Sequence, residues 1–552
     1  LELVELLSHY DVALREHLVR LQERTDSQVV YSYMSPETQN EFISLLAKHV
    51  TGKLVSDINN AKYFGILFDS TPDVSHTDQM STVIRYVHIS GGTVEVRESF
   101  LGFFHLKGKT ATALTGDILE KLENEGLDIQ LCRGQGYNNA ASMAGIHGGV
   151  QQKIKDINPK AIFVPCSNHS LNLCGKHSFA NNPSCVTFFG SLEALYTLFA
   201  LSTHRWDVLV KYTGLTVKRL STTRWSAHAD AVKPVIQKFN QFVEAIEALC
   251  DVEESVETRG AAHNLLPAIC EFSFISFLFF WGDVLQEVDL AQKYMQTPGI
   301  TVDMVATKLR ALKVFLEEQR TKVVDNAVQP ALAKCEELDI PTEKRIIRKR
   351  RLPGDEARDA GLSLQQETKR AMLECLDRFH MELDTRGKEV NDILLTFSAV
   401  QPDHIICAND EEIQLSVTKL TAVYDELSEE DLCLEIPRLR RHLQAAEINL
   451  EEAKHWTVLQ FLRFIIKWDF VESLSYLTLT LRFFLTICVS VASCERSFSK
   501  MKLIKNYLRS TMSQSRLSDL AVLSIEHELT RQIDFDDVID LFATMKTRRH
   551  SF

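Results

Sequence analysis

The chain has 552 residues, of which 45% are hydrophobic and 24% are charged, an ordinary composition for a globular protein. The length predicts roughly three or four domains, with enough apolar material for several cores. The formal net charge of −13 excludes a protein that binds nucleic acid nonspecifically over its whole surface, so any such contact must use a local basic patch.

The first predicted elements are helices followed by strands. Residues 1–58 carry apolar residues at helical spacing. Residues 63–68 form a short apolar run that ends at Asp69 and is typical of a buried strand. Residues 80–89 and 93–104 are rich in strand-forming residues and flank a Gly-Gly turn, which predicts a hairpin.

Two further strands are expected to alternate with helices. The predicted elements are a helix over 110–125, a strand over 128–132 before a glycine-rich turn, a helix over 138–157 and a strand over 161–165. The order β-β-β-α-β-α-β predicts an antiparallel meander, followed by strands that lie parallel because helices connect them. This is the strand order of the RNase H fold.

A long helical region follows. Residues 170–480 show helical patterns and almost no strand signals, so we expect an all-α insertion after the fifth strand. Within it, the acidic stretch 426–431 predicts a solvated linker. The expected fold class is α/β plus an all-α insertion, an RNase H-like catalytic core split by a large helical insertion domain. The expected parts are an N-terminal helical segment at 1–58, the first part of the core at 59–170, the helical insertion domain at 171–475, the final core helix with the C-terminal region at 476–530, and a tail at 531–552.

The sequence does not indicate a membrane protein, a secreted protein or a disulfide-rich protein. The most apolar run, 272–281, is too short to cross a bilayer, and the start of the chain does not resemble a signal peptide. We therefore expect an intracellular protein without membrane contact. Twelve cysteines without a C-x-x-C pair argue against a disulfide framework and against structural zinc. Because the sequence begins with Leu1, we expect it to be a segment of a longer protein.

Two basic segments interrupt the acidic chain. Residues 344–351 read KRIIRKRR, which is a nuclear-import signal, a DNA contact or a solvated loop. Its cationic side chains are Lys344, Arg345, Arg348, Lys349, Arg350 and Arg351. The second segment, a predicted helix near 496–509, is either a solvated face or a DNA contact.

Carboxylates at predicted strand ends suggest metal-dependent chemistry. Phosphodiester cleavage by an RNase H-like fold uses two divalent metals about 4 Å apart, held by carboxylates from strand ends and a later helix. Asp69 ends the first strand and Glu495 begins the last helix. Asn138 follows the fourth strand, where an acid is expected. Taken alone, Asp69 is also typical of a turn and Glu495 of a helix N-terminus.

Five motifs occur in a fixed order along the chain. They are FDSTPDVSHTDQMS, CRGQGYNNAASMAG, PCSNHSLNLC, STTRWSA and SCERSFSKMKLIKNYLR. Together they resemble the hAT transposase superfamily, and most of all its domesticated vertebrate members, described as MYM-type zinc-finger or transposase-derived repressor-like proteins. The matching stretch runs from 64 to 523. The N-terminal zinc finger that usually reads sequence in this family is absent from these residues.

The resemblance implies roles for individual residues. Asp69 and Glu495 match the first and last catalytic carboxylates of the family, and Asn138 stands where the family has its second aspartate. Cys166 and His169 match a C-x-x-H feature near the active centre and the DNA end. For this pair the alternative is a buried thiol beside a hydrogen-bonded histidine.

Further DNA contacts are implied at Trp225, Arg224 and Arg496. Trp225 resembles the aromatic residue that stabilises an altered DNA end, and a tryptophan can stack on an unstacked base for about 1–3 kcal/mol. Packing of Trp225 in a core is the alternative.

The implied cofactor is Mg²⁺ or Mn²⁺, held weakly because Asn138 lacks the charge of an aspartate. The implied partners are a second copy of the chain, in a homodimer or higher assembly, DNA, and regulatory proteins of unknown identity. Residues 476–530 resemble the family's dimerisation region. The part near Glu495 must also serve the core, so we expect the part after Leu508 to be freer to meet a partner. The apolar residues that motivate this are Leu477, Leu479, Leu481, Phe483, Phe484, Leu485, Leu517, Leu520, Val522, Leu523 and Ile525.

Three functions stay open. The first is a nuclear, dimerising, transposase-derived protein that keeps DNA affinity but has lost strand cleavage. The second is an active metal-dependent transposase or nuclease, and the third is a protein-interaction scaffold with no nucleic-acid role. Asn138 separates the first from the second, and a gel shift with hairpin or nicked DNA separates the first from the third.

Overall fold

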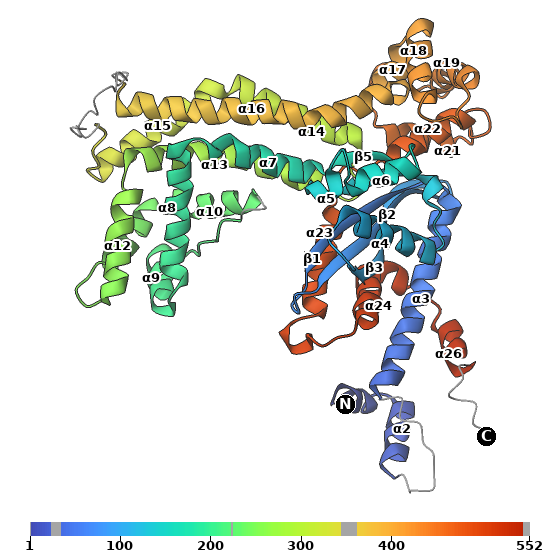
Figure 1. Ribbon diagram of the computed structural model, residues 1–552, viewed down its shortest axis with the longest axis horizontal. Helices are drawn as coiled ribbons and strands as arrows, with labels where there is room; N and C mark the ends of the chain where they lie inside the picture. Colours follow the sequence, from blue (N-terminus) through green and yellow to red (C-terminus); the bar gives the residue numbers. More distant parts are fainter. Residues whose placement is uncertain (1, 24–34, 222–224, 344–361, 545–552) are drawn as a thin grey trace. The chain divides into compact units, whose positions relative to one another are not determined.

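The computed structural model describes residues 2–23, 35–221, 225–343 and 362–544. The chain forms two compact units (Figure 1). The first contains Leu1–Gln135, Gly145–Ala161 and Val491–Phe552, and the second contains Gly136–Ala144 and Ile162–Ser490. Each unit is therefore assembled from segments that are distant in the sequence.

The described strands form one five-stranded sheet in the order β3-β2-β1-β4-β5. The strands are β1 (Phe64–Pro72), β2 (Asp78–Ser90), β3 (Thr93–His105), β4 (Cys132–Tyr137) and β5 (Ile162–Pro165). β1 pairs with β2 and β2 with β3, both antiparallel, as the meander prediction requires. The succession of strands and helices along the chain also follows the prediction.

Two local predictions were wrong near the fourth strand. Residues predicted as strand at 128–132 instead form η1 (Ile129–Leu131), and the expected GQGY turn lies within β4. Every residue of β4 is buried, so burial between neighbours outweighs the weak strand propensity of its two glycines. The predicted helix over 138–157 is two short helices, because the glycine-rich stretch 145–149 interrupts it.

Among the helices of the first unit, α3 (Pro36–Ala61) packs on β2 and β3. The sequence after Val491 contributes α23 (Ala492–Ile504), η3 (Tyr507–Arg509) and α24 (Gln514–Ile525). The remaining helices are α1 (Glu2–Ser8), α2 (Val12–Gln22), α4 (Ala111–Asn124), α6 (Val150–Ile157), α25 (His527–Thr530) and α26 (Phe535–Thr544). α23 packs on β1 and β2, and α24 packs on β3 and α3.

α24 and the residue after it cover the edge strand β3 with polar side chains. Ser518 Oγ accepts a hydrogen bond from the Phe103 amide (3.0 Å), and Glu526 Oε1 accepts one from the Phe100 amide (2.6 Å). Gly102 lies at a bulge in β3 with φ of 112°, and a Cβ there would stand 2.4 Å from Ser518 Oγ. Side chains of the C-terminal region thus satisfy backbone groups that an open sheet edge would leave free.

Glu526 makes stability depend on pH. Burial raises the pKa of this carboxyl above its ordinary value, and the hydrogen bond from Phe100 only partly offsets that rise. Its stabilising contribution is present below the unfolded-state pKa and is lost as pH rises through the raised folded-state pKa. Glu526→Gln keeps the acceptor oxygen without the charge, so we expect it to gain stability on the order of 1 kcal/mol at pH 7 and nothing in acid. Urea unfolding of both proteins across this pH range measures the difference, and an equal gain at every pH would contradict it.

The second unit consists mainly of helices. They are α5 (Ala141–Ala144), α7 (Ser167–Ala180), α8 (Pro183–Ala200), α9 (Thr203–Thr213), α10 (Ser226–Gln237), α11 (Phe239–Ala248), α12 (Val256–Ile269), α13 (Phe272–Met295), α14 (Val302–Glu318), α15 (Arg320–Glu337), α16 (Leu364–Thr396), η2 (Ser398–Val400), α17 (Pro402–Cys407), α18 (Asp410–Thr421), α19 (Glu429–Ala445), α20 (Leu450–Ala453), α21 (Val458–Lys467) and α22 (Ser475–Thr486). No single described helix is long and apolar enough to cross a membrane, although two sharply bent helix pairs pass by length and composition.

The predicted acidic linker was wrong in part. Glu429, Glu430 and Asp431 form the first turn of α19, and Ser428 caps that helix by accepting a hydrogen bond from the Asp431 amide. Carboxylates in a first helical turn interact favourably with the helix dipole. The acidic run therefore marks the start of a helix.

Candidate functional site

Asp69 lies within β1, on the face of the sheet that α23 covers. It is buried, and its Oδ1 accepts a hydrogen bond from the Ser70 amide (3.0 Å). Asp69 stands directly opposite Ser81 of β2, and side chains of directly opposed residues share one face of a sheet. Ser81 in turn reaches α23.

α23 brings Glu495 to the same region. Ser81 Oγ and Ser497 Oγ are 2.8 Å apart, and both residues are buried. Glu495 lies two residues before Ser497, in the first turn of α23, and is half-buried. The first unit therefore places the two predicted carboxylates on neighbouring elements, although more than 400 residues separate them in the chain.

A second series of linked polar side chains fixes the start of α23. Arg85 of β2 and Glu98 of β3 form a buried ion pair at 2.7 Å. Ser493 donates a hydrogen bond to the other carboxylate oxygen of Glu98, and exposed Arg496 donates to Ser493 Oγ (2.6 Å). These contacts orient the helix turn that carries Glu495. Sequence reasoning missed them, because an arginine and a glutamate on separate predicted strands give no sign that they meet.

Asn138 follows β4 and belongs to the second unit. It is half-buried, and its Oδ1 accepts a hydrogen bond from the Ala140 amide (3.1 Å), as asparagine does in a turn. Among the described residues there is no group of three or more His, Cys, Asp or Glu that could hold a metal ion. Two divalent cations bring four positive charges, whereas Asp69 and Glu495 supply two negative ones. The donor set present does not fit a two-metal centre.

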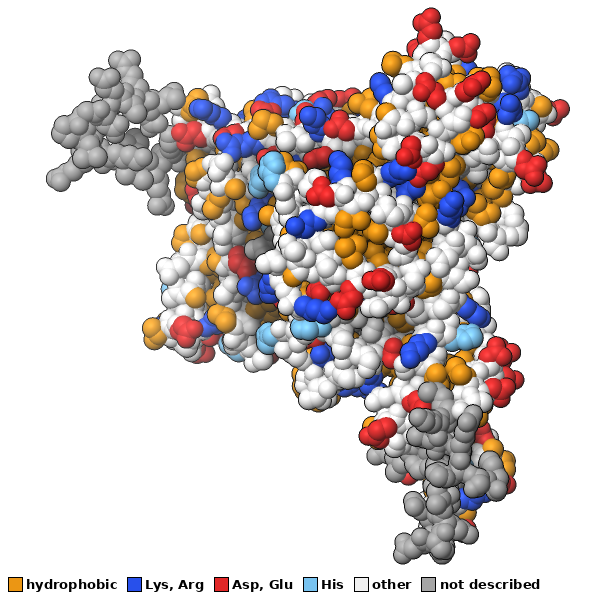
Figure 2. All heavy atoms as spheres, turned by 45° about the vertical axis from the view of Figure 1, so that its right-hand side comes forward, with side chains coloured by type: hydrophobic (Ala, Val, Ile, Leu, Met, Phe, Trp, Pro, Cys, Tyr) orange, Lys and Arg blue, Asp and Glu red, His pale blue; other side chains and the backbone are white. Residues whose placement is uncertain are grey.

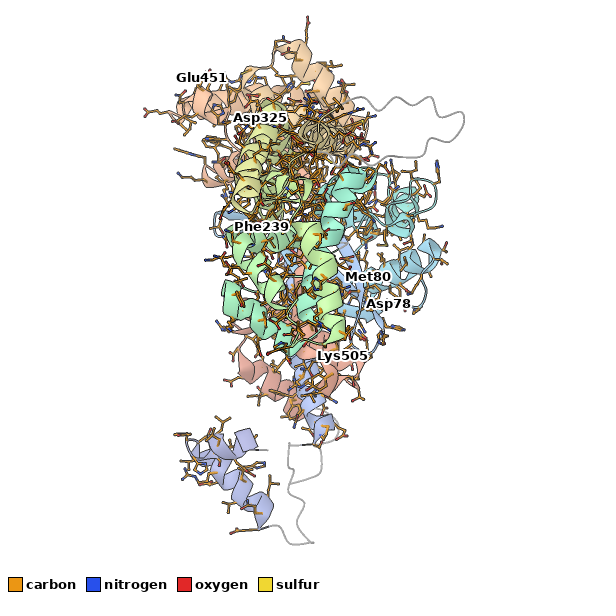
Figure 3. All side chains as sticks on the ribbon, turned by 90° about the vertical axis from the view of Figure 1, so that its left-hand side faces the viewer. Asp78, Met80, Phe239, Asp325, Glu451 and Lys505 are labelled. Atoms are coloured by element: carbon orange, nitrogen blue, oxygen red, sulfur yellow. The ribbon has the colours of Figure 1, made fainter. Side chains whose placement is uncertain are left out.

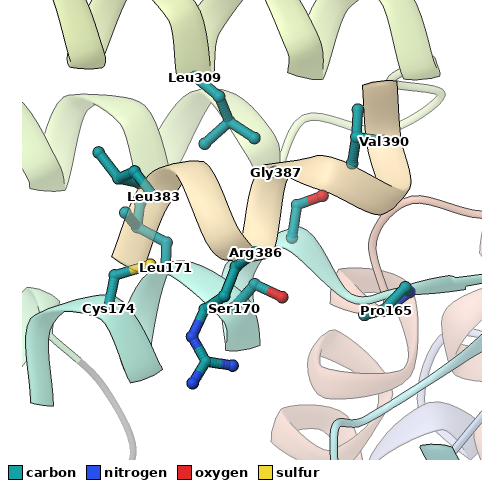
Figure 4. A pocket seen from close by; sticks show the side chains of 10 residues that line it. Pro165, Ser170, Leu171, Cys174, Leu309, Leu383, Arg386, Gly387 and Val390 are labelled. Carbon is teal, nitrogen blue, oxygen red and sulfur yellow. The ribbon is translucent and has the colours of Figure 1, made fainter. Parts of the chain in front are cut away.

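α7 carries the C-x-x-H pair. Cys166 is the N-cap of α7, is buried and forms no disulfide, and His169 follows in the first turn. Beside them, α7 and α16 enclose a cavity of about 10 Å³ lined by Ser167, Ser170 and Leu383 among others (Figure 4). A space of this size holds about one water molecule. It is too small for a nucleotide.

Trp225 is buried, with 3% of its surface exposed. Its indole stacks on His228 with ring centroids 4.6 Å apart, and it also contacts Phe189 and Trp281. Its ring lies flat over the backbone of α7, so close that a Cβ on Gly175 would stand 2.1 Å from it. In this structure the indole face is covered by protein. The signal that could have revealed this packing is a glycine inside a predicted helix, which is costly unless something needs the space.

Some predicted contacts lie outside the described residues. These are Arg224 and the basic segment 344–351. Over the face that Figure 2 displays, acidic and basic side chains are interspersed.

The apolar residues that motivated the dimer prediction are mostly used within the chain. Leu477, Leu481 and Phe484 of α22 are buried in the second unit, and Leu517 and Val522 of α24 are buried in the first. After Leu508, the helix α24 packs on β3 and α3, so its buried side chains are used within the first unit.

Two parts of the chain match known families. Residues 1–149 match the model described as ZMYM1/FAM200, RNase-like domain, and residues 439–529 match the hAT family C-terminal dimerisation region. The resemblance to hAT-derived proteins is therefore confirmed, with one part of the chain similar to an RNase-like domain and another to a hAT C-terminal dimerisation region.

Curated relatives agree with this assignment. The chain is 21% identical over 316 residues to the human protein named 52 kDa repressor of the inhibitor of the protein kinase, covering 54% of this chain and 40% of the relative. The mouse protein of the same name is 20% identical over 313 residues, covering 54% and 41%. The match spans about two fifths of the length of these relatives.

Proposed function

We propose that this chain is a domesticated hAT transposase-like protein that self-associates and contacts DNA in the nucleus without cutting it. Its RNase-like part would be an RNase H-like core interrupted by the helical second unit. The observation that carries the proposal is Asn138, an uncharged amide directly after β4, while β1 next to β4 carries Asp69. The word repressor in the relatives' name and the basic segment 344–351 support the nuclear assignment.

Two residues are candidates for the DNA contact, and they differ in exposure. Arg496 is exposed on the first turns of α23, next to Glu495 in the sequence, so a phosphate could approach its guanidinium, which also donates a hydrogen bond to Ser493. Trp225 could stack on a base only after its aromatic cluster opens, because packed protein covers the ring. The buried indole also favours the second candidate function, a protein-interaction scaffold with no nucleic-acid role.

Restoring the missing charge tests the loss of cleavage. An aspartate at 138 would return the negative charge and the second strong acceptor that asparagine lacks. We expect Asn138→Asp to bind Mn²⁺ at least about 10-fold more tightly than the unmodified chain, because even an outer-shell partner is worth about 10–100-fold. The unmodified chain should show no strand cleavage with Mg²⁺ or Mn²⁺. Calorimetric titration and a nicking assay measure the two quantities.

Asn139→Asp is the matched control, since it adds the same charge one residue away. It should leave Mn²⁺ affinity unchanged. Nicking by the unmodified chain that disappears in Asp69→Ala would disprove the loss of cleavage. A gel shift with nicked duplex DNA at stated salt tests the DNA contact independently, and no shift at low salt would leave the scaffold function.

A further inference from the structure

Three large apolar side chains are exposed within six residues at the end of α23. Leu503, Tyr507 and Leu508 are 72%, 78% and 76% exposed. Leu503 lies in the last turn of α23. Tyr507 and Leu508 lie on the connection from α23 to α24, which Figure 1 shows as a long loop at the end of the sheet. We call these three residues the apolar hook. Such a cluster is costly to leave in water unless something covers it.

The hook is held in place by a buried ion pair. Lys505 Nζ lies 2.7 Å from Asp73 Oδ2, and the side chains are 7% and 1% exposed. Gln79 donates a further hydrogen bond to Asp73 (3.1 Å), and Ser75 Oγ donates to the Ser510 carbonyl (2.8 Å). Figure 3 labels Lys505 and also Asp78, the first residue of β2. These contacts anchor the connection to the turn between β1 and β2, so the hook is presented by ordered backbone.

The hook lies in the segment that matches the hAT dimerisation region, residues 439–529. Among the described residues of that segment, the exposed large apolar side chains are Trp468 and the three hook residues. Trp468 stacks on Phe470 within its own unit. Most large apolar side chains of α22 and α24 are buried in the two cores, and four are half-buried, namely Leu479, Leu520, Leu523 and Ile525. The hook is therefore the most exposed apolar surface that the described part of this region offers to a second chain.

We propose that the apolar hook is the self-association surface of this protein, and that a second copy of the same chain covers it. The inference rests on the proposed function, because it locates the self-association which that function includes. Exposed Lys500, Lys502 and Arg509 flank the hook, so two hooks that meet bring like charges together. Salt screens that repulsion. Association should therefore persist at high salt, whereas a contact with nucleic acid weakens.

The test is sedimentation equilibrium of the full chain and its variants at low and high salt. We expect Tyr507→Ala to raise the dimer dissociation constant by about 30-fold or more, as loss of a buried aromatic anchor does. Leu508→Asp should raise it at least as much, because a charge would be buried in the interface. The matched control is Leu415→Asp, at a surface leucine of α18 that is 60% exposed and outside the region, and it should change nothing. Circular dichroism checks that each variant is folded.

Each other outcome overturns the inference. The hook is not the surface if the unmodified chain is a monomer at tens of micromolar, or if the hook variants and the control dissociate alike. If the variants keep their dimer but lose affinity for nicked duplex DNA, the hook contacts nucleic acid instead. The nicking assay and the gel shift of the unmodified chain test the proposed loss of cleavage and the proposed DNA affinity. Sedimentation of the hook variants tests the self-association surface, so the two proposals can fail independently.

Discussion

Lys505→Met is expected to lose about 3–5 kcal/mol of folding free energy, because removing one partner leaves a buried charge uncompensated. Asp73 would keep the hydrogen bonds from the Ser75 and Thr77 amides and from Gln79, but it would lose the ion pair with Lys505. Urea unfolding at pH 7 measures the loss. Lys502→Met, on the same helix but exposed, is the control and should stay within about 0.5 kcal/mol of the unmodified protein.

The same variant has a defined pH dependence. Burial raises the pKa of Asp73, but hydrogen bonds from Lys505, Thr77, Ser75 and Gln79 outweigh it, so the pKa lies below its ordinary value. A lowered folded-state pKa gives stability that is present above the unfolded-state pKa of about 3.9 and is lost as pH falls through the folded-state value. The difference between Lys505→Met and the unmodified chain should therefore shrink below about pH 4. A penalty that grows in acid would show that the ion pair is not its source.

Gly175→Ala is expected to lose about 3 kcal/mol or more, at the upper end of overpacking costs. The added Cβ would meet three atoms of the Trp225 indole at 2.1 to 2.5 Å, so the ring must leave its site between α7, His228 and Trp281. Alanine is otherwise the better helix former by about 1 kcal/mol, so a loss here isolates the clash. Urea unfolding and tryptophan fluorescence measure the two consequences.

Gly190→Ala is the matched control. This glycine also lies inside a helix, α8, and a Cβ there meets nothing within 4 Å. We expect a gain of up to about 1 kcal/mol. Trp225→Leu in the Gly175→Ala background should recover part of the loss, since the smaller side chain vacates the space. If Gly175→Ala behaves like Gly190→Ala, the indole does not occupy the position described.

The hairpin, the helix after it and the succession of strands and helices could be predicted from the sequence, because they depend on local patterns. A Gly-Gly turn between two runs of strand formers specifies β2 and β3, and Thr110 and Gly126 bracket α4. Predictions failed where burial overrode local preference, as at the glycines of β4. They also failed where one sequence pattern is typical of two structures. The acidic run at the start of α19 is typical both of a solvated linker and of a first helical turn.

The sequence by itself determined the carboxylates at Asp69 and Glu495, the amide at Asn138 and the family likeness, because these depend on residue identity and order. Only the tertiary structure decided that the elements carrying Asp69 and Glu495, β1 and α23, pack together. Ser81 and Ser497 join β2 to α23 across more than 400 residues, and no local pattern encodes a contact of that range. The same holds for exposure, because α22, α24 and the hook are all apolar in sequence. Packing on β3, on α3 and within the second unit covers most of the apolar side chains of α22 and α24, and it leaves the hook residues the most exposed among them.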